Sequence, residues 1–84
     1  MDKLKALNYI FDNGIFWTNN LRDFLNIPYL GTFKENKEYQ SLTSLIIKLR
    51  MNEIIQCCGK KYVHNQYMVV NFIKLKEEID TYLK

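Results

Sequence analysis

The stretch that most constrains the fold of this chain is Asn36–Asn52, NKEYQSLTSLIIKLRMN, which contains no glycine or proline. Apolar residues recur in it at positions i, i+3, i+4 and i+7, a spacing that places their side chains on one stripe of an α-helix. We therefore predict an amphipathic helix over residues 36–52, with Asn36 or Ser41 as its N-cap. The stripe consists of Leu42, Leu45, Ile46 and Leu49. The rest of the chain is expected to be organised around this helix.

The opposite side of the predicted helix carries polar side chains that can donate hydrogen bonds to base edges or phosphates. They are Lys37, Gln40, Ser44 and Lys48. Ile47 and Met51 lie on the same side, and apolar groups on a solvent-facing surface often mark an interface. The alternative interpretation is a solvated face with ordinary polar residues. The apolar pair favours a contact surface.

Three further helices are predicted from the same kind of periodicity. The first spans Lys3–Asn13 and ends at Gly14, which suits a left-handed cap. The second spans Asn19–Leu25 with Thr18 as its N-cap, and the last runs to the C-terminus with Asn71 as its N-cap. The predicted apolar stripes are Leu4, Leu7, Ile10 and Phe11 in the first helix, Leu21, Phe24 and Leu25 in the second, and Phe72, Leu75, Ile79, Tyr82 and Leu83 in the last.

Strand signals occur in three places. Ile15–Trp17 is apolar and β-branched or aromatic throughout, which favours a short strand. Glu53–Cys58 and Tyr67–Val70 are predicted to pair as a hairpin. Its turn fits either Gly59–Lys60 or His64–Asn65, and the sequence leaves both positions open.

The two cysteines, Cys57 and Cys58, are adjacent. A disulfide between neighbours requires a strained ring, so a disulfide framework is excluded, and two thiols without spaced partners disfavour a zinc site. On the first hairpin strand we expect Ile55 and Cys57 to point inward, with one cysteine buried and the other half-exposed. Free thiols indicate a reducing, intracellular compartment.

At 84 residues and 48% hydrophobic residues, the chain suits a single domain, residues 1–84, with one modest core. Its net charge of +3 permits an anionic partner without requiring one. The N-terminal segment MDKLKALNYIFDNG has neither a long apolar run nor a small-residue cleavage site. We therefore expect no signal peptide and no membrane span, and a cytoplasmic protein.

Basic side chains follow the first hairpin strand, at Lys60, Lys61 and His64. Lysines at a hairpin tip can bind phosphates, with an affinity that falls as salt rises. Alternatively, these charges protect an edge strand from association. His64 is the only histidine and has no catalytic partner pattern, and no phosphate-binding glycine motif or metal-ligand spacing is present. We therefore predict a non-enzyme without metal or cofactor.

The element order resembles the winged helix-turn-helix family. The resemblance is carried by FWTNNLRDFLNIP (16–28), SLIIKLRMNEII (44–55) and GKKYVHNQYMVV (59–70). It implies a mostly helical α+β fold, with a three-helix core, a two-stranded β-wing and a C-terminal helix. It also implies that the third helix enters the DNA major groove. The family's apolar signature before the wing is matched by Leu45, Leu49, Asn52, Ile54 and Ile55. One departure is the long connection 26–35, where the family has a short turn.

Two functional hypotheses follow. The first is a small transcriptional regulator that binds double-stranded DNA through helix 36–52 and the wing. The second is a protein-binding inhibitor of a host complex on the same scaffold, as in small phage-encoded inhibitors, including anti-CRISPR proteins. Its predicted contact residues are Ile47, Met51, Tyr29 and Phe33, the last two in the long loop, where they either fold back on the core or form an apolar lip. A homodimer formed through the last helix is compatible with both hypotheses.

Overall fold

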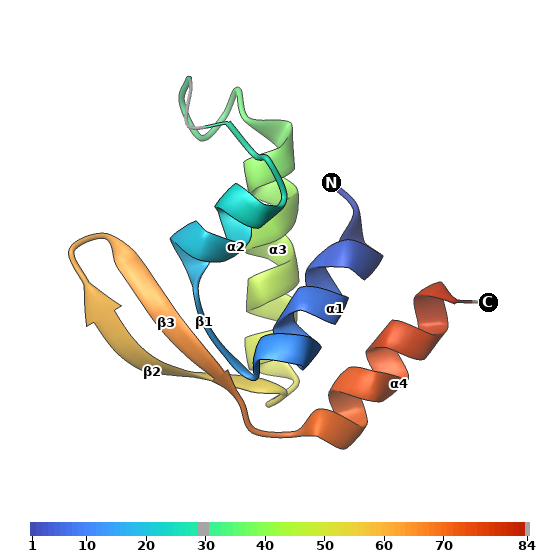
Figure 1. Cartoon of the computed structure of the whole chain (residues 1–84). Helices are drawn as coiled ribbons and strands as arrows, with labels where there is room; N and C mark the ends of the chain where they lie inside the picture. Colours follow the sequence, from blue (N-terminus) through green and yellow to red (C-terminus); the bar gives the residue numbers. More distant parts are fainter. Residues whose placement is uncertain (29–30, 84) are drawn as a thin grey trace.

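The computed structural model describes residues 1–28 and 31–83 and has an α+β fold (Figure 1). This confirms the predicted fold class at that level. The described elements, in chain order, are α1 (Lys3–Asn13), β1 (Ile15–Trp17), α2 (Thr18–Phe24), α3 (Lys37–Met51), β2 (Ile55–Lys61), β3 (His64–Val69) and α4 (Phe72–Tyr82).

Helix α3 forms as its periodicity predicts. Its first turn is capped by Asn36, whose side chain accepts a hydrogen bond from the backbone N–H of Tyr39 at 3.0 Å. The predicted stripe is confirmed, because all four of its residues are buried: Leu42, Leu45, Ile46 and Leu49. After Met51 the chain reverses at Glu53, which adopts a positive φ of 59°. Ile54 and Ile55 then continue the core from the helix into the sheet.

Helices α1 and α4 lie side by side, and α1 also contacts β1 (Figure 1). Helix α1 has the predicted bounds and ends at Gly14, whose φ of 72° is one that L side chains rarely adopt. In α4 the predicted apolar stripe is only partly buried. Leu75 and Ile79 belong to the core, whereas Phe72 and Leu83 are exposed.

The short strand β1 pairs with the hairpin, so the sheet has the strand order β1-β3-β2 and is antiparallel throughout. In this pairing Ile15 lies opposite Met68 and Trp17 opposite Gln66. The two predicted hairpin strands are therefore part of a three-stranded sheet. The turn of the hairpin lies near the start of α2, with which it borders a hollow.

Both predicted positions of the hairpin turn are wrong. Lys61 pairs with His64, so the turn consists of Tyr62 and Val63. A bulge at Cys58 shifts the cross-strand register by one residue, and Gly59 pairs with Gln66 within β2. There a Cβ atom on Gly59 would come within 2.8 Å of the Gln66 side chain, so this glycine serves a close cross-strand approach and not a turn.

The expected burial of the cysteines is also wrong, because Cys57 and Cys58 are both exposed. Ile55 is buried as predicted, but it lies at the base of the hairpin. Cys57 lies on the edge strand β2, in which Ile55 is the only buried residue. Strand alternation predicts which side a residue faces but not whether that side is covered.

Helix α2 starts one residue earlier than predicted, and Thr18 is not its N-cap. Thr18 is the first helical residue, and its hydroxyl accepts a hydrogen bond from the backbone N–H of Asn65 at 3.4 Å. This bond joins α2 to β3. Leu21 is fully buried as predicted, but Phe24 is exposed on one side and packs its ring against Tyr9, with centroids 4.7 Å apart.

Candidate nucleic-acid interface

The four polar side chains predicted on helix α3 do converge on one place. Lys37, Gln40, Ser44 and Lys48 line a hollow of about 450 Å³. The structure adds Lys3 from the start of α1, Ser41 and Leu45 from α3, and Tyr82 from the end of α4. We name this site the lysine hollow, because three lysines from two helices border it together with two serine hydroxyls. Lys3 was missed by sequence analysis, since only the packing of α1 beside α3 brings it here.

Within the lysine hollow, Lys48 is engaged in an ion pair. Its Nζ lies 3.2 Å from Oε2 of Glu78, which joins α3 to α4. Half of the Lys48 side chain is exposed, so solvent screens the pair and it contributes little to stability. Lys3 and Lys37 are exposed. The positive charge that the lysine hollow offers to a phosphate therefore comes mainly from Lys3 and Lys37.

Gln40 has a structural task that the sequence did not indicate. Its amide nitrogen donates to the backbone carbonyls of Phe33, at 2.7 Å, and Lys34, at 2.9 Å. Gln40 thus fastens the long connection to α3. Pairing of this amide with a base would require these hydrogen bonds to be exchanged.

Of the two aromatic residues predicted as contacts in the long loop, the structure describes only Phe33. Tyr29 lies outside the described residues. Phe33 packs edge-to-face on Tyr39, with centroids 5.6 Å apart, yet half of its surface is exposed. The loop near Phe33 therefore both folds back on α3 and presents an apolar surface.

Ile47 and Met51 are exposed, at 47% and 79%. Ile47 also lines a second hollow, of about 260 Å³, between α3 and the hairpin. Arg50 borders the same hollow and holds its guanidinium over the ring of Tyr67, 5.6 Å from the centroid. Arg50 was not predicted as a site residue, although it lies three residues after Ile47 and hence on the same side of the helix.

The predicted hairpin residues lie apart from the lysine hollow. Lys60 and Lys61 are exposed on the edge strand β2, and His64 is half-buried opposite Lys61. Lys61 and His64 line a third hollow, of about 300 Å³, which we name the hairpin-tip hollow. Its other lining residues are Trp17, Asn19, Asn20 and Tyr62. The predicted nucleic-acid residues are thus divided between two locations.

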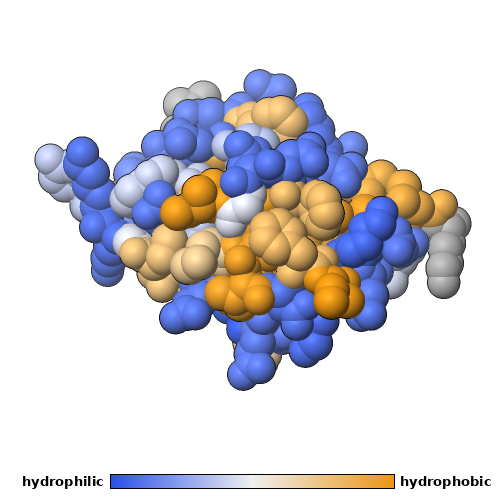
Figure 2. Space-filling model, turned by 60° about the horizontal axis from the view of Figure 1, so that its bottom comes forward, coloured by the Kyte–Doolittle hydropathy of each residue, from blue (hydrophilic) through white to orange (hydrophobic). Residues whose placement is uncertain are grey.

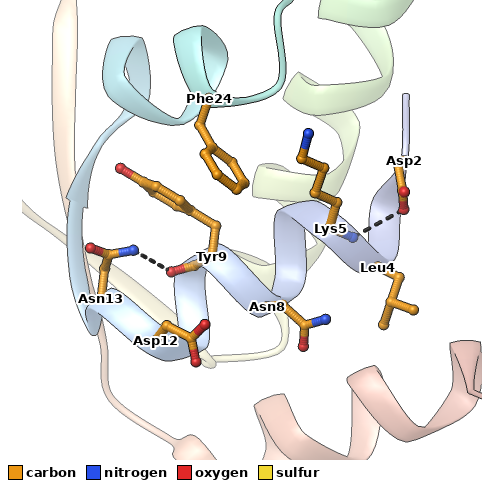
Figure 3. Close-up of a pocket in the computed structure, with 8 residues that line it drawn as sticks. All are labelled: Asp2, Leu4, Lys5, Asn8, Tyr9, Asp12, Asn13 and Phe24. Atoms are coloured by element: carbon orange, nitrogen blue, oxygen red, sulfur yellow. Dashed lines mark hydrogen bonds between the residues drawn. The ribbon is translucent and has the colours of Figure 1, made fainter.

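A fourth hollow, of about 540 Å³, lies between α1 and α2 and has a different chemistry (Figure 3). Asp2 and Asp12 border it, and their carboxylates disfavour a phosphate. Asp2 also caps α1 by accepting from the backbone N–H of Lys5 at 3.0 Å. The Lys5 ammonium lies 5.0 Å from the ring centroid of Phe24. These polar groups stabilise the helix and its contact with α2, so we place no nucleic-acid contact here.

An exposed apolar patch gathers where α1 ends, β1 begins and the chain passes from β3 into α4. Its members are Phe11, Ile15, Met68, Val70, Phe72 and Ile73. Figure 2 shows this face of the molecule, which we name the apolar base. Phe11 and Phe72 meet edge-to-face at 5.6 Å, and Ile15 pairs with Met68 across the strands. The patch combines segments that are distant in sequence, so periodicity within any one element did not indicate it.

The chain matches no protein-family model, no curated protein and no solved structure. In residues 1–28 and 31–83, no helix is both long enough and apolar enough to cross a bilayer. The same residues contain no cluster of histidine, cysteine and acidic side chains suited to a metal ion.

Proposed function

We propose that this protein is a small DNA-binding regulator that places helix α3 against duplex DNA. The observation that carries the proposal is the lysine hollow, in which Lys3, Lys37 and Lys48 converge beside Ser41 and Ser44. Lysines bind phosphates as point charges, and serine hydroxyls donate to phosphates or base edges. Ile47 and Met51, exposed on the same helix, are suited to apolar contact with thymine methyl groups.

The arrangement of the elements supports a winged-helix mode of binding. Helix α2 precedes α3, and the β2–β3 hairpin follows α3 directly. Residues of α3 and the hairpin, including Arg50 and Val63, border one hollow. In this proposal α3 enters the major groove and the hairpin lies beside it, where Lys60 and Lys61 reach the phosphates.

A mobility shift with duplex DNA at several salt concentrations tests this proposal. We expect the Lys37→Ala variant to bind more weakly and to reduce the slope of log K against log salt by about 1, since one phosphate contact is lost. Lys76→Ala is the matched control, because Lys76 pairs with Asp80 on α4 and does not border the lysine hollow. Equal effects of the two variants, or no shift of any duplex at low salt, would contradict the proposal.

A second candidate is a protein-binding module, which the apolar base favours. Apolar patches of this kind on a small soluble domain often mark protein interfaces. Ile73, 76% exposed, is its most accessible member. The test is capture of a partner after nuclease treatment, with Ile73→Asp as the disrupting variant and Lys76→Asp, at an exposed position of α4 outside the apolar base, as its control. Loss of all captured protein on nuclease treatment would exclude this candidate.

The predicted homodimer through α4 can be tested on the protein eluted from the same capture experiment. Leu75 and Ile79 are buried in the core of their own chain, so they are not available to contact a copy, whereas Phe72 and Leu83 are exposed. Light scattering of the eluted protein would report its mass directly.

A further inference from the structure

The turn between β2 and β3 is built from residues that do not favour a turn. Tyr62 adopts a φ of 57°, a conformation that usually belongs to glycine or asparagine. Tyr62 and Val63 are also the most exposed large apolar side chains described, at 84% and 85%. Local backbone strain and solvent-exposed apolar surface both oppose stability here. Strain of this kind often coincides with a contact site.

The two turn residues border different hollows. Val63 lines the hollow between α3 and the hairpin, whereas Tyr62 lines the hairpin-tip hollow. The hairpin-tip hollow is formed by three elements: Trp17 ends β1, Asn19 and Asn20 lie in the first turn of α2, and Lys61 and His64 flank the turn. Its volume of about 300 Å³ is at the lower end for small-ligand sites.

The residues that line the hairpin-tip hollow indicate the chemistry of a ligand that would fit it. Two aromatic side chains, Trp17 and Tyr62, border it, as do two amide side chains and the ammonium of Lys61. Among the described residues that line it there is no carboxylate, in contrast to the hollow between α1 and α2. A ligand for this site is therefore planar, able to hydrogen-bond along an edge, and negatively charged.

We infer that the hairpin-tip hollow binds a nucleobase together with its phosphate. The base stacks on the rings of Trp17 and Tyr62, an interaction that any base can make. The amide of Asn20, which is exposed, offers both a donor and an acceptor to the base edge, as in pairing with adenine. Lys61 binds the phosphate. This site is separate from the lysine hollow, and the inference does not depend on duplex binding there.

Trp17 is the only tryptophan in the chain, so its fluorescence reports on this hollow directly. We expect a single-stranded oligodeoxyadenylate to quench the emission. An abasic oligonucleotide of the same length, which carries the phosphates without bases, is expected to leave it unchanged. Adenosine monophosphate is the third probe. Quenching by the monophosphate at similar concentrations assigns the site to a free nucleotide, and quenching by the oligonucleotide alone assigns it to an unpaired base in a chain.

Two variants locate the effect. Tyr62→Gly removes the ring and relieves the positive φ, so the hairpin is retained, and we expect about tenfold weaker binding of the oligodeoxyadenylate. Lys61→Ala should also weaken binding, whereas Lys60→Ala is the matched control, because Lys60 is the neighbouring exposed lysine and does not line the hollow.

Three results would overturn the inference: no quenching by either base-bearing probe, equal quenching by the abasic oligonucleotide, or equal weakening by Lys60→Ala and Lys61→Ala. The duplex mobility shift of Lys37→Ala is measured separately. Failure of one proposal is thus distinguishable from failure of the other.

Discussion

The amide nitrogen of Gln40 donates a hydrogen bond to the backbone carbonyl of Phe33 at 2.7 Å and so fixes the long connection onto helix α3. The last part of that connection forms its own turn, in which the backbone N–H groups of Glu35 and Asn36 both donate to the carbonyl of Thr32 at 3.1 Å. The turn and the glutamine side chain therefore hold the loop end in one conformation.

Replacement of Gln40 by alanine should loosen this loop while leaving the core intact. We expect hydrogen exchange at the amides of Glu35 and Asn36 to become faster, and the free energy of unfolding to fall by no more than about 1 kcal/mol, because the lost bonds are solvent-exposed. Gln56→Ala, an exposed glutamine on β2, is the control. Unchanged exchange in the Gln40 variant would show that the turn alone orders the loop.

The hairpin turn should become more stable when its tyrosine is removed. Tyr62→Gly relieves a positive φ that costs an L residue about 1–2 kcal/mol, against an entropic cost of about 0.5–1 kcal/mol for glycine. We therefore expect the free energy of unfolding to rise by about 0.5 kcal/mol in urea denaturation. Val63→Gly is the control, and it should lower the free energy of unfolding. Val63 does not have a positive φ, so glycine there only adds entropy to the unfolded chain. A stability loss for Tyr62→Gly would mean that its ring stabilises the fold.

Those features that depend on local periodicity and capping were predictable from the sequence. The bounds of α1, the buried stripe of α3 and the capping of α4 by Asn71 all follow from residues within a few positions of one another. The convergence of Lys37, Gln40, Ser44 and Lys48 was predictable for the same reason, because they share one face of one helix.

Features that depend on packing between distant segments were not predictable. The turn at Tyr62–Val63 lies between two segments with better turn residues, and its position follows from the cross-strand register of β2 and β3, which includes a bulge at Cys58. Lys3 and Tyr82 reach the lysine hollow only through the way α1 and α4 pack. In each case the deciding contact joins residues that no periodicity relates.

Within α3, the buried and exposed faces should differ sharply in their response to truncation. Leu49 is fully buried, and Leu49→Ala should lower the free energy of unfolding by about 2–5 kcal/mol, a large share of the stability of so small a domain. Met51→Ala, on the exposed face of the same helix, should change it by less than about 0.5 kcal/mol. Urea denaturation of both variants measures the difference. A comparable loss for Met51 would place it in a packed interface, for instance between two copies of the chain.

The exposed position of both cysteines predicts their reactivity. In the native protein we expect two thiols per chain to react with an aromatic disulfide reagent, because Cys57 and Cys58 are both exposed on β2. The thiol of Cys57 makes only a weak contact with the carbonyl of Gly59, at 3.5 Å. This contact should slow the reaction of Cys57 with the reagent only slightly. The single variants Cys57→Ser and Cys58→Ser should each retain one reactive thiol. If one thiol reacts only after urea is added, the corresponding side chain is covered in solution, and β2 is then not a free edge but part of a contact with another chain.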